Sequence, residues 1–334
     1  MALKVGINGM GRIGRTVLRE LVNRGVQLEI CAVNDLCDID TTAHLLSFDS
    51  VHGRFGHEVK AEGDMLKVGN QTIKYYKEKD PTNIPWEKHN IQLVIDSTGI
   101  FKDKPGLSKH MRGSVKKVMM CAPGKGLDGT FVMGVNSNTY DNAKHHIISN
   151  ASCTTNCLAP LAKVLNDKFG IKHGMMTTIH SYTGDQRILD AAHSDLRRAR
   201  AGVVSMIPTT TGAAAAVGEV IPSLNGKLDG YAVRVPTPNV SLVDFTATLN
   251  KPATIEEVNA ALKEAANSSL KGILDFEERE LVSVDYMSCR ASSTVDASLT
   301  NVIADQVKVV SWYDNEAGYS NRVIDLALLI GSKL

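Results

Sequence analysis

The sequence lacks the features that mark membrane, secreted and nucleic-acid-binding proteins. No apolar run approaches the length of a transmembrane helix, and the first ten residues lead directly into a strand, so we expect neither a membrane span nor a signal peptide. The formal net charge is only +1, which gives no general attraction to nucleic acid or membranes. These absences indicate an ordinary soluble enzyme, and its 334 residues are enough for two domains.

The cysteines show neither a disulfide framework nor metal-ligand spacing. Six of them are spread over the chain, which favours free thiols in a reducing cytoplasm. Cys153 and Cys157 stand one helical turn apart, but no other cysteine or histidine lies at ligand spacing nearby. We therefore expect no metal site.

A glycine-rich turn joins the first predicted strand, 3–7, to the first predicted helix. Its glycines complete the G-x-G-x-x-G fingerprint of dinucleotide-binding domains. Gly9 permits the tight turn, Gly11 lets a pyrophosphate approach the backbone, and Gly14 allows close packing of helix on sheet. The pyrophosphate would rest on the helix N-terminus, where the N–H groups belong to Arg12 and Ile13.

An acidic residue at the end of the second predicted strand, 28–33, supports this interpretation. Asp35 stands 21 residues after Gly14, close to the spacing of about 20 at which an acid binds the adenosine ribose. The strand, the helix and the acid together predict a bound dinucleotide.

Two further buried-strand patterns, 93–99 and 115–124, end in small polar residues. Ends of this kind lie where ligands bind in open parallel sheets. Cys121 and Lys79 are therefore candidate cofactor contacts, with a packed thiol and a solvated amine as the alternatives.

A hydroxyl-rich run of small residues, 149–156, leads into an apolar pattern with helical spacing. Ser152 and Thr154 are candidate capping residues, which places Cys153 at the first turn of the helix. The N–H groups and the helix dipole there favour a nucleophilic thiolate. The alternative is a small buried hydrophobe, a role that suits Cys157.

A nucleophile of this kind needs a base, and His180 is the main candidate. It ends an apolar, β-prone run, 175–179, and a loop follows it, so we expect a strand that delivers the imidazole to a loop rim.

The chain after His180 is rich in arginine, hydroxyls and glycine. A Thr-Thr-Thr-Gly run, 209–212, opens a predicted helix and is suited to an anion. Arginine side chains often form a solvated face, but in this part of the chain they are interleaved with hydroxyl-bearing residues. This interleaving predicts two phosphate-sized anion sites. The arginines are Arg187, Arg197, Arg198, Arg200 and Arg234. Strand patterns at 242–249 and 302–312 and a helix at 255–267 then predict a mixed α+β domain, followed by a C-terminal helix at 322–330.

Five segments together resemble the phosphorylating glyceraldehyde-3-phosphate dehydrogenases, in the right order over the whole chain. They are 6–15, 149–156, 180–183, 209–214 and 312–316. The resemblance implies a Rossmann dinucleotide-binding domain over 1–152, joined by the C-terminal helix 316–334, and a mixed α+β catalytic domain over 153–315. It also implies NAD as cofactor, glycolytic use in the cytoplasm, and a homotetramer whose arginine-bearing loop lies at a subunit interface.

The resemblance also implies a mechanism. Cys153 attacks the aldehyde of glyceraldehyde 3-phosphate, and His180 accepts the hydroxyl proton as hydride leaves; the charge on His180 favours the thiolate beforehand. Inorganic phosphate then releases 1,3-bisphosphoglycerate from the thioester. One phosphate site corresponds to Thr183 and Arg234, with Arg198 as a substrate-phosphate arginine, and the other to Ser152, Thr154, Thr211 and Gly212. Asn315 corresponds to the residue that orients the nicotinamide carboxamide, and Tyr319 to one that packs near that ring.

Three departures from the family pattern concern the cofactor. Cys121 replaces a common Ser or Thr, and Gly184 stands where many NAD-specific bacterial relatives have Asn. The pair Ala191-Ala192 replaces the Leu-Pro of those relatives and resembles members that accept NADP. Because Asp35 repels a 2′-phosphate, we expect NAD to be preferred with some use of NADP. The alternatives are erythrose-4-phosphate dehydrogenase, a semialdehyde dehydrogenase whose cysteine context differs, and a non-catalytic binding protein with the same fold.

Overall fold

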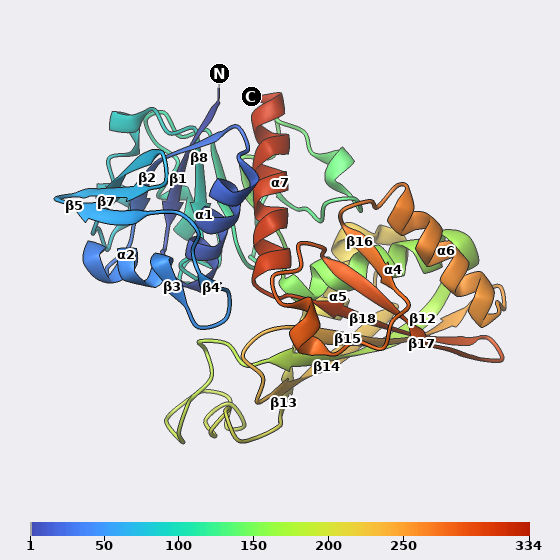
Figure 1. Ribbon diagram of the computed structural model, residues 1–334. Coiled ribbons are helices and arrows are strands. Elements are labelled where there is room, and N and C mark those ends of the chain that lie inside the picture. The colour runs from blue at the N-terminus through green and yellow to red at the C-terminus, as the bar shows by residue number, and fades with distance from the viewer. Residues whose placement is uncertain (1) are drawn as a thin grey trace. The chain divides into compact units, whose positions relative to one another are not determined.

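A computed structural model describes residues 2–334, in which the chain forms two units with one large sheet each (Figure 1). The first unit comprises the chain up to Phe131, Thr139–Ala151 and Ser320–Leu334. The second comprises Val132–Asn138 and Ser152–Tyr319.

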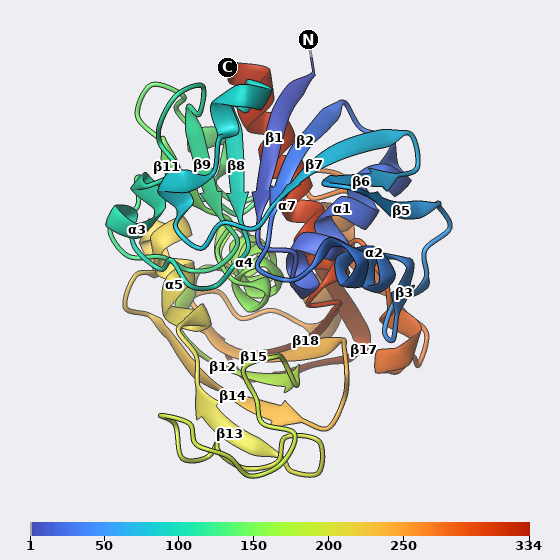
Figure 2. The same ribbon diagram turned by 90° about the vertical axis from the view of Figure 1, so that its left-hand side faces the viewer.

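The first unit is built on a nine-stranded sheet whose central strands are parallel (Figure 2). Its central strands β1, β8 and β9 are almost wholly buried, as in sheets covered on both faces, whereas the edge strands β7, β6 and β5 pair antiparallel. This architecture confirms the predicted Rossmann domain. In spatial order the strands are β10 (Gly129–Thr130), β11 (Ile147–Ser149), β9 (Lys117–Met120), β8 (Leu93–Asp96), β1 (Leu3–Asn8), β2 (Leu28–Asn34), β7 (Gln71–Tyr76), β6 (Met65–Val68) and β5 (Val59–Glu62).

The helices of the first unit are α1 (Arg12–Arg24), α2 (Ile39–Ser47), α3 (Lys104–Ser108) and most of α7 (Ala317–Lys333). Arg24 of α1 donates hydrogen bonds to Asp325, at 2.7 Å, and to Asn321, so the C-terminal helix is fixed beside α1. A small hairpin, β3 (Phe48–Asp49) with β4 (Gly53–Arg54), follows α2.

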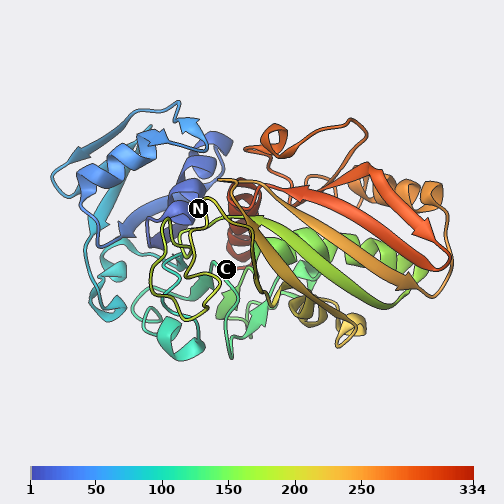
Figure 3. The ribbon, with the colours of Figure 1, turned by 90° about the horizontal axis from the view of Figure 1, so that it is seen from below.

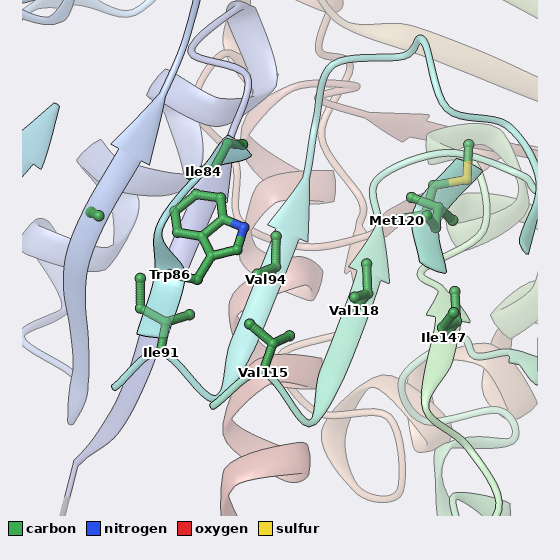
Figure 4. Close-up of a cluster of buried hydrophobic side chains, with 10 residues drawn as sticks. Ile84, Trp86, Ile91, Val94, Val115, Val118, Met120 and Ile147 are labelled. Atoms are coloured by element: carbon green, nitrogen blue, oxygen red, sulfur yellow. The ribbon is translucent and has the colours of Figure 1, made fainter. Parts of the chain in front are cut away.

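An apolar cluster centred on Trp86 packs against one face of this sheet (Figure 4). The indole ring lies over β1 at Gly6, where a Cβ atom would come within 2.8 Å of the ring. Gly6 is therefore required by packing. Around the indole lie Ile84, Ile91, Val94, Val115, Val118, Met120 and Ile147.

The second unit is built on a seven-stranded mixed sheet with three helices on one face (Figures 1 and 3). Its strands, in spatial order, are β13 (Ile207–Thr210), β14 (Leu228–Val235), β12 (Ile171–Ser181), β15 (Ser241–Leu249), β18 (Gln306–Tyr313), β17 (Ser293–Ile303) and β16 (Leu274–Glu277). The helices are α4 (Cys153–Phe169), α5 (Ala213–Val220) and α6 (Ile255–Asn267).

The predicted mixed α+β domain is thus confirmed, but the single strand expected at 302–312 is wrong. The chain turns at Ala304, whose φ is 55°, so β17 and β18 form a hairpin there.

Within residues 2–334, no helix combines the length and the apolar character needed to cross a bilayer.

Candidate active site

The candidate nucleophile lies at the N-terminus of α4, as predicted. Ser152 is the N-cap, and its hydroxyl accepts a hydrogen bond from the backbone N–H of Thr155 at 3.0 Å. Cys153 is consequently the first helical residue and is half-buried. Its Sγ lies 3.5 Å from Nε2 of His180, so the structure brings together the two residues that the sequence selected.

The register of two parallel strands places Arg234 beside His180. On β12 and β14, His180 is paired with Arg234. Arg234 Nη1 lies 2.8 Å from Nδ1 of His180 and donates to the carbonyl oxygen of Ser181 at 3.1 Å. The same oxygen is 2.7 Å from Nδ1 of His180.

Two neighbours of Nδ1 bear on the protonation of the imidazole. The carbonyl oxygen of Ser181 can only accept a hydrogen bond, so it favours the tautomer of His180 with hydrogen on Nδ1. The guanidinium of Arg234 can only donate, so its approach to the same nitrogen opposes that tautomer, although it also donates to the Ser181 carbonyl. With hydrogen on Nδ1, Nε2 is an acceptor that faces the sulfur of Cys153, which is the arrangement that a general base requires.

The electrostatics of the pair differ from the prediction. Burial, together with the guanidinium of Arg234, lowers the pKa of His180 to about 3, so the imidazole is neutral near pH 7. Burial also raises the pKa of the Cys153 thiol, and it outweighs the opposing effects of Arg234 and Thr154. Both shifts oppose the expected charge on His180, and Arg234 is the first cation among the influences that favour the thiolate.

Thr154 lies beside the nucleophile but faces the interior. Its hydroxyl is 2.9 Å from the hydroxyl of Tyr313, which also bonds to Thr178 at 2.8 Å. The ring of Tyr313 meets that of His180 edge-on, so the tyrosine contacts both the candidate base and Thr154, the neighbour of the candidate nucleophile. The predicted second capping role of Thr154 is not found, since Ser152 alone is the cap.

The N-termini of α4 and α5 converge near the predicted second anion site. Thr155 donates to the carbonyl of Ala213 at 3.4 Å, across the two helix starts. Gly212 is the N-cap of α5, and the hydroxyl of Thr211 accepts a bond from the N–H of Ala213. Two helix N-termini, each with a neighbouring hydroxyl, are suited to an anion.

Arg198, the predicted substrate-phosphate arginine, already has hydrogen-bond partners in the protein. Arg198 donates to Asp185 at 2.6 Å, to the hydroxyl of Thr209 at 2.9 Å and to a backbone carbonyl. An anion at this arginine would have to compete with Asp185. Thr183 is half-buried just after β12, and its N–H donates to the side chain of Gln186.

The glycine turn of the first unit has the shape that a pyrophosphate requires. Gly9 has a φ of 97°, which disfavours other residues, and a Cβ on Gly14 would stand 2.0 Å from the carbonyl oxygen of Gly9. A Cβ on Gly11, in contrast, would meet no protein atom within 4 Å. Gly11 caps α1 without a side chain, which leaves room for a phosphate at this helix N-terminus.

The other cofactor candidates lie at the same edge of this sheet. Asp35, directly after β2, accepts hydrogen bonds from the N–H groups of Met10 and Cys37 and is thereby held beside the glycine turn. Lys79 is exposed beyond β7, and Cys121 follows β9. Burial raises the pKa of the Cys121 thiol, as for a packed residue.

Sequence reasoning missed two exposed apolar residues at this edge. Leu36 and Ile100 follow β2 and β8 and are 55% and 70% exposed. Large apolar side chains next to a ligand-binding edge are typical of surfaces that a flat ring covers. Their position directly after a buried strand is the signal that could have indicated them.

The last predicted cofactor residues lie at the end of β18. Asn315 is buried, and its Oδ1 accepts bonds from the hydroxyls of Ser181 and Ser241. Tyr319 is buried in the first turn of α7. Over the described part of the chain, no group of three histidine, cysteine or acidic residues could hold a metal ion.

Comparisons with known proteins agree with this geometry. Residues 3–104 match the family profile of the glyceraldehyde 3-phosphate dehydrogenase NAD binding domain, and residues 152–315 match that of the C-terminal domain. The chain is 58% identical over 331 residues to glyceraldehyde-3-phosphate dehydrogenase 1 of Bacillus cereus, covering 99% of each protein. It is also 58% identical, over 334 residues, to glyceraldehyde-3-phosphate dehydrogenase 1 of Bacillus subtilis, covering 100% of this chain and 99% of the relative. The same identity and coverage hold for the enzyme of Geobacillus stearothermophilus.

Proposed function

The chain belongs to the glyceraldehyde-3-phosphate dehydrogenase family, and we propose that its Cys153 and His180 carry out the NAD-dependent oxidation of glyceraldehyde 3-phosphate. The observation that carries this assignment is the 3.5 Å approach of Cys153 Sγ to Nε2 of His180, whose other ring nitrogen lies 2.7 Å from the carbonyl oxygen of Ser181. Cofactor binding is assigned to the first unit and the covalent chemistry to the second.

The reaction begins with the thiol. Cys153 transfers its proton to Nε2 of His180, and the sulfur adds to the aldehyde carbon to give a thiohemiacetal. The developing oxyanion takes up that proton, which leaves His180 neutral again. His180 then removes the proton from the thiohemiacetal hydroxyl as the C–H bond breaks with its electron pair. NAD, when bound, supplies the acceptor for that hydride, and a thioester remains on Cys153.

The second half of the reaction needs phosphate. An oxygen of inorganic phosphate attacks the thioester carbon, and the C–S bond breaks with its electron pair on sulfur. As 1,3-bisphosphoglycerate leaves, the Cys153 thiolate takes back the proton that His180 accepted in the first half-reaction, which restores the thiol and the neutral imidazole. The two predicted anion sites supply the binding groups for both phosphates. One consists of Thr183, Arg198 and Arg234. The other consists of Ser152, Thr211, Gly212 and the backbone of Thr154, whose hydroxyl faces Tyr313.

The residues of the first unit fit NAD. The open backbone at Gly11 leaves room for a pyrophosphate, and the carboxylate of Asp35 would accept hydrogen bonds from the adenosine ribose. The same charge would repel the 2′-phosphate of NADP. Lys79 and Cys121 remain candidate contacts, and Asn315 is assigned to the nicotinamide carboxamide.

A homotetrameric assembly is supported by unpartnered apolar surface on the second unit. Met175 and Tyr231, on the sheet face that carries no helix, are 60% and 49% exposed. The loop between β12 and β13 adds further exposed side chains, so a second copy of the chain is the partner that we infer. These side chains are Ile188, Leu189, Leu196, Val204 and Met206. A cytoplasmic location would suit the free thiols.

One assay tests the reaction and its alternatives. NADH formation is followed by absorbance with glyceraldehyde 3-phosphate or erythrose 4-phosphate, with and without inorganic phosphate. We expect sustained turnover only with glyceraldehyde 3-phosphate and phosphate. Phosphate-independent turnover of erythrose 4-phosphate would support a hydrolytic relative, and no NADH in any mixture would support a binding protein. Sedimentation of the full chain tests the tetramer.

A further inference from the structure

Two buried serine hydroxyls hold the side-chain amide of Asn315, and the mechanism above does not use them. Ser181 Oγ donates to Asn315 Oδ1 at 2.8 Å, and Ser241 Oγ donates to the same atom at 2.9 Å. The exposed fractions of the serines are 0% and 1%, so water does not compete for these bonds. They arrive from two strands, since β12 ends at Ser181 and β15 begins at Ser241.

This arrangement decides which end of the amide faces inward. Oδ1 of Asn315 receives both hydroxyl protons, which fills its two acceptor positions. In the reversed orientation, the two hydroxyl protons would have only each other's oxygen as an acceptor, 3.4 Å away. Among residues 2–334, none accepts a hydrogen bond from Asn315 Nδ2. The amide therefore offers its N–H donors to something other than the protein.

The residue before Ser241 has a strained backbone, which hydrogen bonds on both sides of it hold in place. Val240 has a φ of 67°, which is costly for a β-branched residue. On either side of it, Asn239 donates to Asp314 at 2.7 Å and Ser241 donates to Asn315. Two consecutive residues at the end of β18 are thus held by the two neighbours of the strained valine.

We propose that Ser181 and Ser241 are positioning residues that fix the Asn315 amide with Nδ2 outward, so that it donates to the carbonyl oxygen of the nicotinamide carboxamide. The inference rests on the proposed function, in which Asn315 orients that group. The serines touch neither cofactor nor substrate and act through the asparagine alone.

Binding of NAD and of ADP-ribose to the purified full-length protein tests the proposal. ADP-ribose uses the same dinucleotide site but has no carboxamide. We expect Ser181→Ala and Ser241→Ala to raise the Kd for NAD by about three- to tenfold each, the usual effect of one buried hydrogen bond. The Kd for ADP-ribose should stay within about twofold. Ser311→Ala is the matched control, because this buried serine of the same sheet bonds to Ser293 and not to Asn315.

A double-mutant cycle with Asn315→Ala separates positioning from general damage. If the serines act through Asn315, neither substitution changes the Kd for NAD further in the Asn315→Ala background. Equal losses for NAD and ADP-ribose, no loss, or losses that persist without Asn315 would each overturn the inference. If Asn315→Ala itself leaves NAD binding unchanged, the assignment of Asn315 fails and the inference fails with it. Melting temperatures of all variants report any loss of folding.

Discussion

Replacing Arg234 tests which residue supplies the positive charge that stabilises the Cys153 thiolate. In Arg234→Gln the guanidinium is lost while a planar, hydrogen-bonding side chain is kept. Burial already raises the pKa of Cys153, and Arg234 is the leading opposing influence. The substitution should therefore reduce the thiolate population near neutral pH.

The magnitude follows from the geometry of the group. Arg234 Nη1 is 2.8 Å from one imidazole nitrogen of His180, and Cys153 Sγ is 3.5 Å from the other, so the charges lie within roughly 9 Å of each other. At that distance two unit charges interact by about 2 kcal/mol at an effective dielectric of about 20, or roughly thirtyfold in thiolate population. A more basic thiolate is intrinsically more nucleophilic, which offsets part of the loss. We expect alkylation at pH 7 to slow about five- to tenfold.

The assay is the rate of alkylation by iodoacetamide, measured from pH 5 to pH 10 and confirmed by peptide mapping. The profile of Arg234→Gln should be displaced to higher pH, while that of Arg234→Lys, which retains the charge, should lie close to the wild type. His180→Asn serves as the comparison, because a neutral imidazole contributes no charge. If His180→Asn displaces the profile and Arg234→Gln does not, the imidazole is charged after all and the reasoning is refuted.

Four further predictions concern the base, the cofactor and the fold. His180→Asn should slow hydride transfer by roughly 10²–10⁴-fold in single-turnover NADH formation, and normal turnover would place the base elsewhere. Between pH 7 and pH 5, the free energy of unfolding of the same variant, measured in urea, should fall less than that of the wild type. The unfolded wild type gains a proton at His180 below its ordinary pKa of 6.5, whereas the native state, with a pKa of about 3, does not. Asp35→Ala should raise kcat/KM with NADP relative to NAD, and no gain would show that charge does not set the choice. Gly14→Ala should weaken NAD binding and lower the melting temperature, because its Cβ would meet the carbonyl oxygen of Gly9 at 2.0 Å, and an unchanged Kd would contradict this packing.

Structural features that are determined by short stretches of sequence were predictable. The glycine turn, the N-cap at Ser152 and the helix 255–267 depend on neighbours within a few residues. Asp35 was recognisable by its spacing of 21 residues from Gly14. The Cys153–His180 pair was also found, because a thiol at a helix start and a histidine at a strand end are each recognisable locally. Their actual approach, however, is a property of the folded sheet.

Features that depend on strand register or on turns without glycine or proline were not predictable. The pairing of His180 with Arg234 joins strands more than fifty residues apart, and nothing in either segment specifies that register. Burial of His180 and, after it, the guanidinium of Arg234 lower the pKa of the imidazole, and neither influence can be recognised from the segment around His180 alone. The turn at Ala304 was missed for a similar reason, since alanine rarely adopts a positive φ.

The sheet of the second unit explains why this chemistry tolerates little rearrangement. β12 ends at Ser181, β15 begins at Ser241 and β18 ends at Tyr313, and paired registers hold these three ends together. The base, the tyrosine beneath it and the serines that hold Asn315 therefore belong to one rigid edge, whereas Arg198 comes from a loop and is engaged by Asp185. Under the proposed function, His180 and Asn315 keep their geometry through the reaction because strands hold them, whereas Arg198, on a loop, exchanges Asp185 for phosphate. On this reasoning, a substitution at Asp185 should alter anion affinity while leaving the alkylation profile of Cys153 in place.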